Sequence, residues 1–110
     1  MHHAPLPNCH DGMGDLDFIE VLGEKETAQS SLNFMHDDIL APGVTIGEHM
    51  HHEDVEYYYI LSGSGVMILD GVRHPVGPGD IAAVFPGGTH GLENTGKGDL
   101  RIIVISVQPG

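Results

Sequence analysis

The sequence is poor in cysteine, in long apolar runs and in basic residues, and each shortage excludes a class of protein. The 110 residues contain one cysteine, Cys9, so no disulfide forms within the chain, which fits a reducing compartment. No apolar run approaches the roughly 18 residues of a membrane-spanning helix. The first residues, MHHAPLPNCHDGMG, lack the apolar core of a secretory signal. We therefore expect a cytoplasmic protein with no membrane partner.

Basic side chains are the scarcest charged type. Four Lys and Arg stand against 16 Asp and Glu, which gives a formal net charge of -12. The phosphates of nucleic acids and of anionic lipids would be repelled by such a chain, so we expect neither as a partner. An acidic balance also fits a site that collects cations, although most acidic proteins are simply soluble proteins without one.

Helical periodicity is almost absent as well. Only GEKETAQS, residues 23–30, is weakly helical, and it is too short and polar for a core helix. Short runs rich in Val, Ile, Tyr and Phe alternate instead with turns built from the 16 Gly and 7 Pro. The Asp70-Gly71 pair is the signal of a two-residue type I′ hairpin. The runs predict strands over residues 16–22, 31–35, 55–61, 65–69, 80–85 and 100–107.

The pattern of many short strands predicts an all-β antiparallel sandwich or barrel. A chain of 110 residues has room for one ordinary domain. Residues 1–14 carry no strand pattern, so we expect an arm-like or disordered N-terminal segment there and a single barrel domain over residues 15–110.

Histidines and acids concentrate in the stretch GEHMHHEDVE. His49 and His51 are two residues apart, so on a strand they share a face. Glu56 lies at an odd spacing from both, and convergence of the three requires a turn or bulge, for which the polar HED in between is suited. His90 follows the turn PGGT and begins another short strand. These four side chains can meet only inside a small barrel or sandwich.

Three imidazoles and one carboxylate form a ligand set for a divalent transition metal, namely Mn, Fe, Co, Ni, Cu or Zn. Such a set leaves one or two coordination positions open, which is where a substrate or oxygen binds. The alternative is a polar surface cluster without a metal.

The same residues carry a resemblance to the cupin superfamily, and in particular to its small single-domain, cupin 2-type members. The stretch matches every fixed position of the first cupin motif, which here are Gly43, His49, His51, Glu56 and Gly63. The second cupin motif corresponds here to Gly79, Phe85, Gly87, His90 and Asn94, which resemble it at four of its five positions. Phe85 stands where the family pattern has proline, a departure that affects the shape of a turn and not metal ligation. The resemblance extends over about residues 33–107.

This resemblance implies a double-stranded β-helix, or jelly-roll barrel, whose metal ligands are His49, His51, Glu56 and His90. It implies a metalloenzyme of dioxygenase, decarboxylase, lyase or isomerase type that acts on a small, oxygen-rich organic substrate. The alternative is a non-catalytic module that binds or senses a metal or a small molecule. Members of the family are so diverse in function that fold analogy does not select a reaction.

No general base stands out beyond the ligands. Glu53, His36 and Tyr58 are candidates for catalysis, and they compete with the roles of turn residue, solvated histidine and core aromatic. Tyr58 is also a candidate for lining a substrate pocket. Arg73 and Arg101 are the only arginines and therefore the candidates for binding an anionic substrate, although each also fits a surface charge.

Strand alternation directs Tyr57 and Tyr59 away from the side on which Tyr58 lies. Two outward tyrosines on an apolar strand suggest a sheet face that is covered by another subunit. The resemblance to small cupins implies a homodimer that pairs through such a face, so we expect a homodimer.

Overall fold

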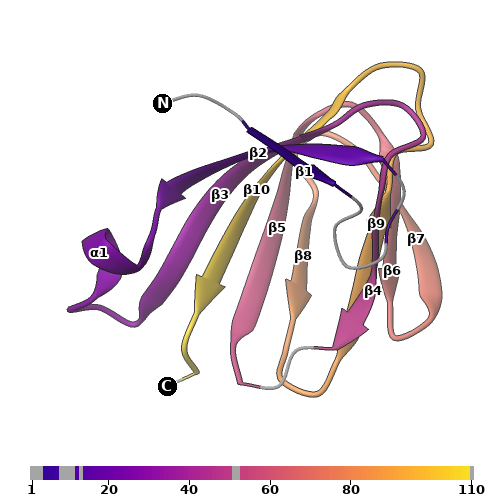
Figure 1. The fold of residues 1–110 in the computed structure, drawn as a ribbon. Coiled ribbons are helices and arrows are strands. Elements are labelled where there is room, and N and C mark those ends of the chain that lie inside the picture. The colour runs from indigo at the N-terminus through magenta and orange to yellow at the C-terminus, as the bar shows by residue number, and fades with distance from the viewer. Residues whose placement is uncertain (1–3, 8–11, 13, 51–52, 110) are drawn as a thin grey trace.

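The computed structural model of the chain describes residues 4–7, 12, 14–50 and 53–109. Two antiparallel sheets face each other (Figure 1), one with six strands in the order β1-β2-β3-β10-β5-β8 and one with four in the order β4-β9-β6-β7. The elements are β1 (Ala4–Pro7), β2 (Asp15–Leu22), α1 (Glu24–Thr27), β3 (Leu32–Leu40), β4 (Thr45–Met50), β5 (Val55–Ser62), β6 (Gly65–Leu69), β7 (Val72–Val76), β8 (Ile81–Val84), β9 (Thr89–Glu93) and β10 (Leu100–Val107).

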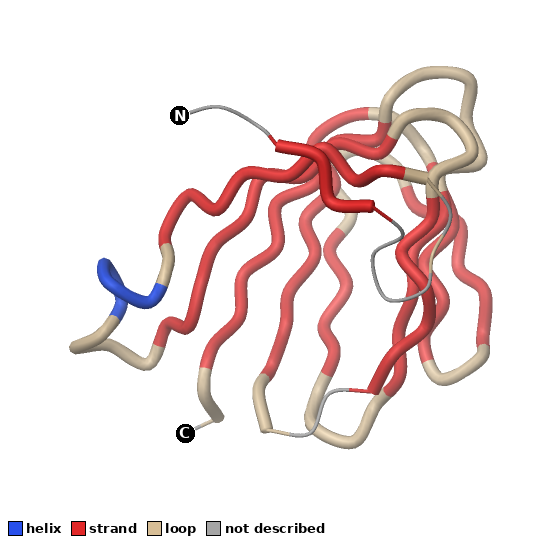
Figure 2. Tube along the Cα trace, in the orientation of Figure 1, coloured by secondary structure: helices blue, strands red, loops and turns tan. Residues whose placement is uncertain are grey.

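This architecture confirms the all-β jelly-roll prediction. The predicted strands at 55–61, 65–69 and 100–107 coincide with β5, β6 and β10 to within a residue. The strand predicted at 31–35 continues to Leu40 as β3, and the only helix in the described part of the chain is the single turn α1. Of the arm expected at residues 1–14, residues 4–7 form β1, which pairs with β2. Figure 2 shows the loops gathered at the two ends of the sheets.

The hairpin predicted at Asp70-Gly71 joins β6 to β7. Both residues have positive φ, 48° and 79°, as a type I′ turn requires. The four motif glycines predicted at turns, Gly43, Gly63, Gly79 and Gly87, also have positive φ. At Gly63 a Cβ atom would lie 2.3 Å from the carbonyl oxygen of Asp99, so the loop closes only around a residue without a side chain.

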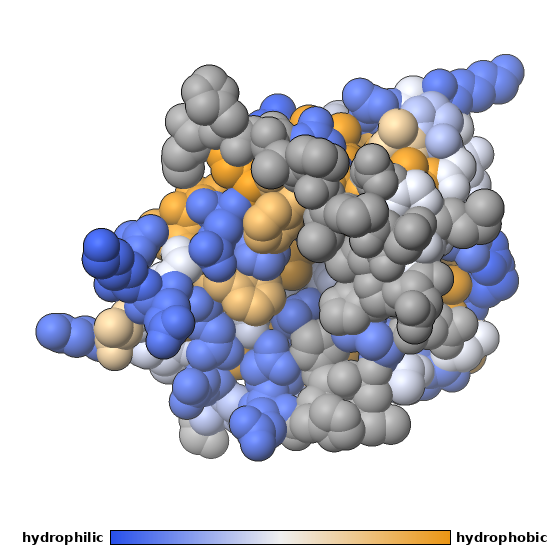
Figure 3. Space-filling view, in the orientation of Figure 1, coloured by the Kyte–Doolittle hydropathy of each residue, from blue (hydrophilic) through white to orange (hydrophobic). Residues whose placement is uncertain are grey.

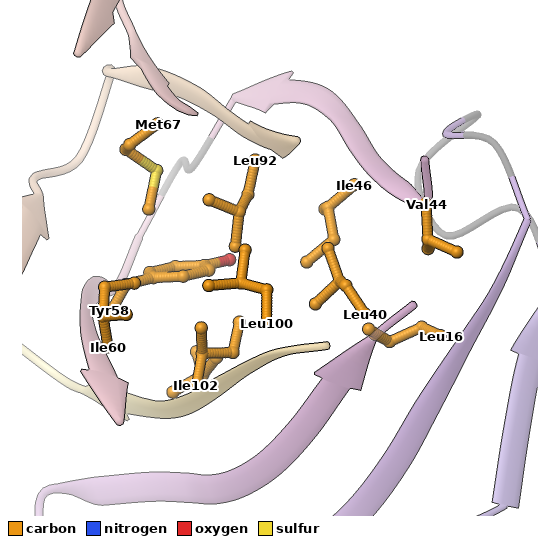
Figure 4. Close-up of a cluster of buried hydrophobic side chains, with 11 residues drawn as sticks. Leu16, Leu40, Val44, Ile46, Tyr58, Ile60, Met67, Leu92, Leu100 and Ile102 are labelled. Atoms are coloured by element: carbon orange, nitrogen blue, oxygen red, sulfur yellow. The ribbon is translucent and has the colours of Figure 1, made fainter. Parts of the chain in front are cut away.

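The core lies between the two sheets and follows from the two-residue alternation along each strand. On β10, Leu100, Ile102 and Val104 are buried, whereas Arg101 between them is exposed. These residues pack against side chains from the opposite sheet, including Met67 and Leu92 (Figure 4). Burial of each such side chain stabilises the fold by about 1.5–3 kcal/mol relative to leaving it exposed.

Asn94 ties the β9 end of the sandwich together. Its Nδ2 donates to the carbonyls of Leu40 and Gly98 at 2.8 and 2.9 Å, and its Oδ1 accepts from the amide of Gly96 at 2.9 Å. Every hydrogen-bonding group of this buried amide therefore serves the backbone, which is a structural role. Within the described residues, no helix is long and apolar enough to cross a membrane.

Candidate metal centre

A bulge in β4 brings His49 to the interior. Ile46 pairs with Leu92 and His49 pairs with His90, so one extra residue is inserted on β4 between the two pairs. Because of this insertion, Ile46 and His49 both face inward despite their odd spacing. The Nδ1 atom of His49 donates to the carbonyl of Gly47 at 3.0 Å. In the neutral ring this tautomer leaves the lone pair on Nε2, which is the usual way a metal-binding histidine is oriented.

Glu56 and His90 approach the same point from two other strands. Glu56 stands near the start of β5 and is 6% exposed, and His90 on β9 is fully buried. The Nε2 atom of His90 lies 3.6 Å from Oε1 of Glu56. The rings of His49 and His90 are 4.2 Å apart between centroids. Strands from both sheets thus present these side chains toward one another.

His49, Glu56 and His90 each offer one ligand atom, and these atoms lie within 4.8 Å of one another. Ligand atoms held about 2.1 Å from a common ion lie about 3–4 Å apart, so the three side chains fit an ion after small adjustments. Two imidazole nitrogens and a carboxylate oxygen are donors suited to a divalent transition metal. His51, the fourth predicted ligand, lies outside the described residues. The turn expected before β5 includes Glu53 and Asp54, which belong to no strand.

Tyr58 lies beside this group and is itself buried, at 4% exposure. Its hydroxyl is hydrogen-bonded to Nε2 of His90 at 2.8 Å. The two rings meet edge to face, with centroids 5.0 Å apart. Among the catalytic candidates, Tyr58 is therefore the one in contact with a predicted metal ligand.

A cavity of about 120 Å³ opens next to the three residues, between the sheets. Its apolar walls come from both sheets, and its polar side chains are two metal-ligand candidates, the neighbouring Tyr58 and two residues of β3. None of the described residues that line it is a lysine or arginine. The lining consists of Leu16, Phe18, Phe34, His36, Asp38, Ile46, His49, Glu56, Tyr58 and Val104.

His36 forms part of this wall. Its ring stacks on Phe34 at 4.1 Å and meets Phe18 edge to face at 4.4 Å. Burial lowers the pKa of His36 below its ordinary value, and the nearby Glu20 carboxylate, 3.7 Å from Nε2, opposes part of that effect. The ring is therefore mostly neutral at neutral pH and able to accept a proton.

Asp38 is the cavity residue that sequence reasoning missed. It is 3% exposed, and burial raises its pKa to about 7, with further contributions from the negative charges of Asp37, Glu56 and Asp17. The signal for it was present, because alternation in FMHDDIL places Asp38 on the same face as His36.

The remaining candidates lie outside the cavity. Glu53 is exposed in the bend before β5. Arg73 forms a bidentate ion pair with Glu93 on the surface of the four-stranded sheet, with nitrogen–oxygen distances of 3.2 and 2.7 Å. Arg101 forms another with Asp37 on the outer face of the six-stranded sheet. Neither guanidinium lines the cavity.

Comparison with known proteins identifies relatives along most of the chain. The family model for the cupin domain matches residues 37–106. The oxalate-binding protein of Thermotoga maritima is 31% identical over 102 residues, which cover 93% of this chain and 84% of that protein. Protein SchB of Streptomyces halstedii is 31% identical over 97 residues, covering 88% of this chain and 67% of that protein.

A solved structure is similar over nearly the whole fold. The crystal structure of a predicted oxalate decarboxylase from Thermotoga maritima superimposes with a TM-score of 0.94. The two chains are 28% identical in sequence, and the match covers 99% of this chain and 94% of that one.

Proposed function

Because this chain belongs to the cupin family, we propose that it is a metal-dependent protein that binds a small, oxygen-rich carboxylic compound in the cavity between its sheets. The ion is held by His49, His51, Glu56 and His90. One observation carries this proposal: His49, Glu56 and His90 offer ligand atoms within 4.8 Å of one another beside a cavity between the sheets.

The donor set suits Mn, Fe, Co, Ni, Cu or Zn, and does not select among them. When bound, such an ion orients a ligand through two oxygens and stabilises negative charge that develops on them. The side chains of the protein supply the rest of the environment. Phe18, Phe34 and Val104 form apolar parts of the cavity wall, and the hydroxyl of Tyr58 is hydrogen-bonded to His90.

The size of the cavity supports a small ligand, and its charge argues against a phosphorylated one. At about 120 Å³ it is well below the roughly 300–1,000 Å³ of pockets for drug-sized molecules. The lack of lysine and arginine among the described lining residues argues against a phosphorylated sugar, whose phosphate needs cationic partners. The relatives named for oxalate support the same class of compound.

Catalysis is the first form of this function that we propose. The reaction is of decarboxylase, dioxygenase, lyase or isomerase type. The cavity contains groups that can move protons, namely His36, Asp38 and Tyr58, as acid–base chemistry requires. The second form is binding without turnover, which the name of the oxalate-binding relative favours.

Elemental analysis and calorimetry test the proposal together. Wild type and a His49→Ala/His90→Ala variant are purified without a tag, and metal content is measured. His74→Ala, which removes an exposed histidine from β7, is the matched control. We expect about one equivalent of metal in wild type and in the control and almost none in the double variant.

Metal-loaded wild type is then titrated with oxalate and assayed for its consumption. Heat that requires the metal supports the proposed site, and consumption of oxalate separates the enzyme from the binding module. A wild type that neither retains nor takes up a metal contradicts the proposal.

A second copy of this chain is the partner that we propose for the outer face of the six-stranded sheet. Tyr59 is 42% exposed and Ile81, paired with it on β8, is 65% exposed. Together with Ile103 and Ile105 on β10, they form an apolar band on this face. Beside the band, Arg101 and Asp37 form an ion pair. On the side of the molecule turned to the viewer, Figure 3 shows exposed apolar residues in the region of β2 and β3. Two chains of charge -12 repel each other, so a contact is favoured where charges are few, and Tyr59, Ile81, Ile103 and Ile105 are all uncharged.

A further inference from the structure

We propose that Asp38 recognises the end of the ligand that is remote from the metal centre, and that it selects compounds carrying a hydroxyl group at that end. Compounds that end there in a methyl group or in a second carboxylate are disfavoured. This inference rests on the proposed function, because it takes the cavity to be the ligand site.

The sheet register places Asp38 at the other side of the cavity from Glu56. Asp38 on β3 pairs with Ile102 of β10, and Ile102 pairs with Ile60 of β5. Glu56, in contrast, pairs with Ser106. The two acids are thus separated by an intervening strand and by several positions along the sheet, yet both line the cavity. A ligand that fills the cavity from the metal centre therefore reaches Asp38 with its distal end.

The Asp38 carboxyl is placed in the cavity at a cost to stability. The side chain is 3% exposed, and in the described part of the chain nothing hydrogen-bonds to its Oδ1 atom. Native proteins leave few buried polar atoms in this condition, and those that remain usually serve a ligand or a reaction. Since much of the cavity wall is Leu16, Phe18 and Val104, an apolar side chain at this position would suit the fold better.

Comparison with the neighbouring Asp37 shows that the loss of stability belongs to the inward-facing position of Asp38. Asp37 points to the outer face of the same strand and forms a bidentate ion pair with Arg101. Asp38 has no such cation, because none of the described residues that line the cavity is lysine or arginine. Two consecutive aspartates therefore play different roles: one forms a surface ion pair, and the other presents an oxygen to the cavity.

A hydroxyl group is the ligand group that suits Asp38 best. An ionised carboxylate only accepts hydrogen bonds, whereas a protonated one also donates. Burial raises the pKa of Asp38 to about 7, so both forms are present near neutral pH. A hydroxyl donates to the first form and accepts from the second. A methyl group leaves the carboxyl oxygen without a partner, and a second carboxylate meets the negative charge of the ionised Asp38.

The test uses matched series of acids with zinc-loaded protein, since zinc has no redox chemistry of its own. Propanoate and butanoate are compared by calorimetry with 3-hydroxypropanoate and 4-hydroxybutanoate, and with malonate and succinate, because shorter acids such as oxalate place both of their oxygen groups on the metal and leave no distal end. For at least one chain length we expect wild type to bind the hydroxy acid about tenfold more tightly than both matched compounds, because a site built to hydrogen-bond a hydroxyl rejects analogues that lack it.

Asp38→Leu is the variant that removes the carboxyl, and Asp37→Asn is the control on the opposite face of the strand. The Asp38→Leu protein should keep its zinc, bind the unsubstituted acids as wild type does and lose the preference for the hydroxyl. Its melting temperature should equal or exceed that of wild type, which a merely structural role would not produce. Asp37→Asn should keep the preference.

Two results overturn the inference about Asp38 alone. One is a wild type that binds zinc and the acids without favouring any hydroxy compound, and the other is a preference that survives in Asp38→Leu. If Asp38→Leu fails to fold, Asp38→Asn replaces it, and loss of folding there too assigns the carboxyl a structural role and overturns the inference. The proposed function itself fails if wild type binds no zinc, or binds no acid in a zinc-dependent way. In that case the inference about Asp38 fails with it.

Discussion

The hydroxyl of Tyr58 and Nε2 of His90 are joined by a 2.8 Å hydrogen bond between two buried side chains. The same Nε2 atom lies 3.6 Å from the carboxylate of Glu56. One lone pair serves either a hydrogen bond or a metal ion, so binding of an ion at this nitrogen displaces the phenol. In the proposed metal site, with Nε2 of His90 as the ligand atom, this hydrogen bond stabilises the metal-free form and competes with the ion.

Replacement of Tyr58 by Phe should raise metal affinity. The lost hydrogen bond stabilises the metal-free state by about 0.5–1.5 kcal/mol, which corresponds to an affinity roughly two- to tenfold higher. Competition against a chromophoric chelator measures the change. Tyr57→Phe is the matched control, because Tyr57 lies on the opposite face of the same strand and should leave the affinity unchanged. Weaker metal binding in Tyr58→Phe would instead assign the hydroxyl a supporting role in the metal-bound state.

Asp38 should make the metal-free protein less stable as pH rises. Burial raises its pKa from 3.8 to about 7, so the folded state holds the proton more tightly than the unfolded state does. Its contribution to the free energy of unfolding is intact below about pH 4 and is lost as the pH rises to about 7, by up to roughly 4 kcal/mol. Repulsion from Asp37, Glu56 and Asp17 adds to the effect of burial.

Guanidinium unfolding from pH 4 to pH 8 tests this prediction in wild type and in Asp38→Asn, which does not titrate. The difference in free energy of unfolding between the two should shift steadily in favour of the variant as the pH rises. A difference that stays constant across the range would show that Asp38 titrates normally.

His36 should titrate below its ordinary pKa because its ring is enclosed by Phe34 and Phe18. The carboxylate of Glu20 favours the charged ring, so Glu20→Gln should lower the pKa of His36 further. Proton NMR of the imidazole resonances follows the titration of His36 in wild type and in Glu20→Gln. A pKa of His36 that rises in Glu20→Gln would show that the two side chains do not interact in solution.

Local chemistry accounts for most of what the sequence predicted correctly. Runs of β-branched and aromatic residues form the strands, and Asp70-Gly71 forms the hairpin because both residues tolerate positive φ. The convergence of His49, Glu56 and His90 was predictable only through the two motifs, since their meeting depends on contacts between distant segments.

Features set by tertiary context were not predictable. The strand β1 contains Pro5 and Pro7, which local propensity assigns to loops, yet an edge strand that pairs only with β2 needs few amide donors. The bulge between Ile46 and His49 exists because β9 fixes the partners on both sides of it. The role of Arg101 likewise follows from Asp37 on a neighbouring strand, far away in the sequence.

Charges placed on the outer face of the six-stranded sheet should separate the proposed dimer. In a Tyr59→Glu/Ile81→Glu variant, two carboxylates per chain would be buried without partners at the contact, in a chain that is already strongly acidic. Sedimentation velocity should give the mass of two chains for wild type and of one chain for the variant. Val72→Glu is the control: Val72 is 57% exposed but lies on β7 of the other sheet, so this variant should keep the mass of two chains. A wild type that sediments as one chain, or a control that dissociates equally, would show that this face is not the interface, and the exposed apolar band would then need a different partner.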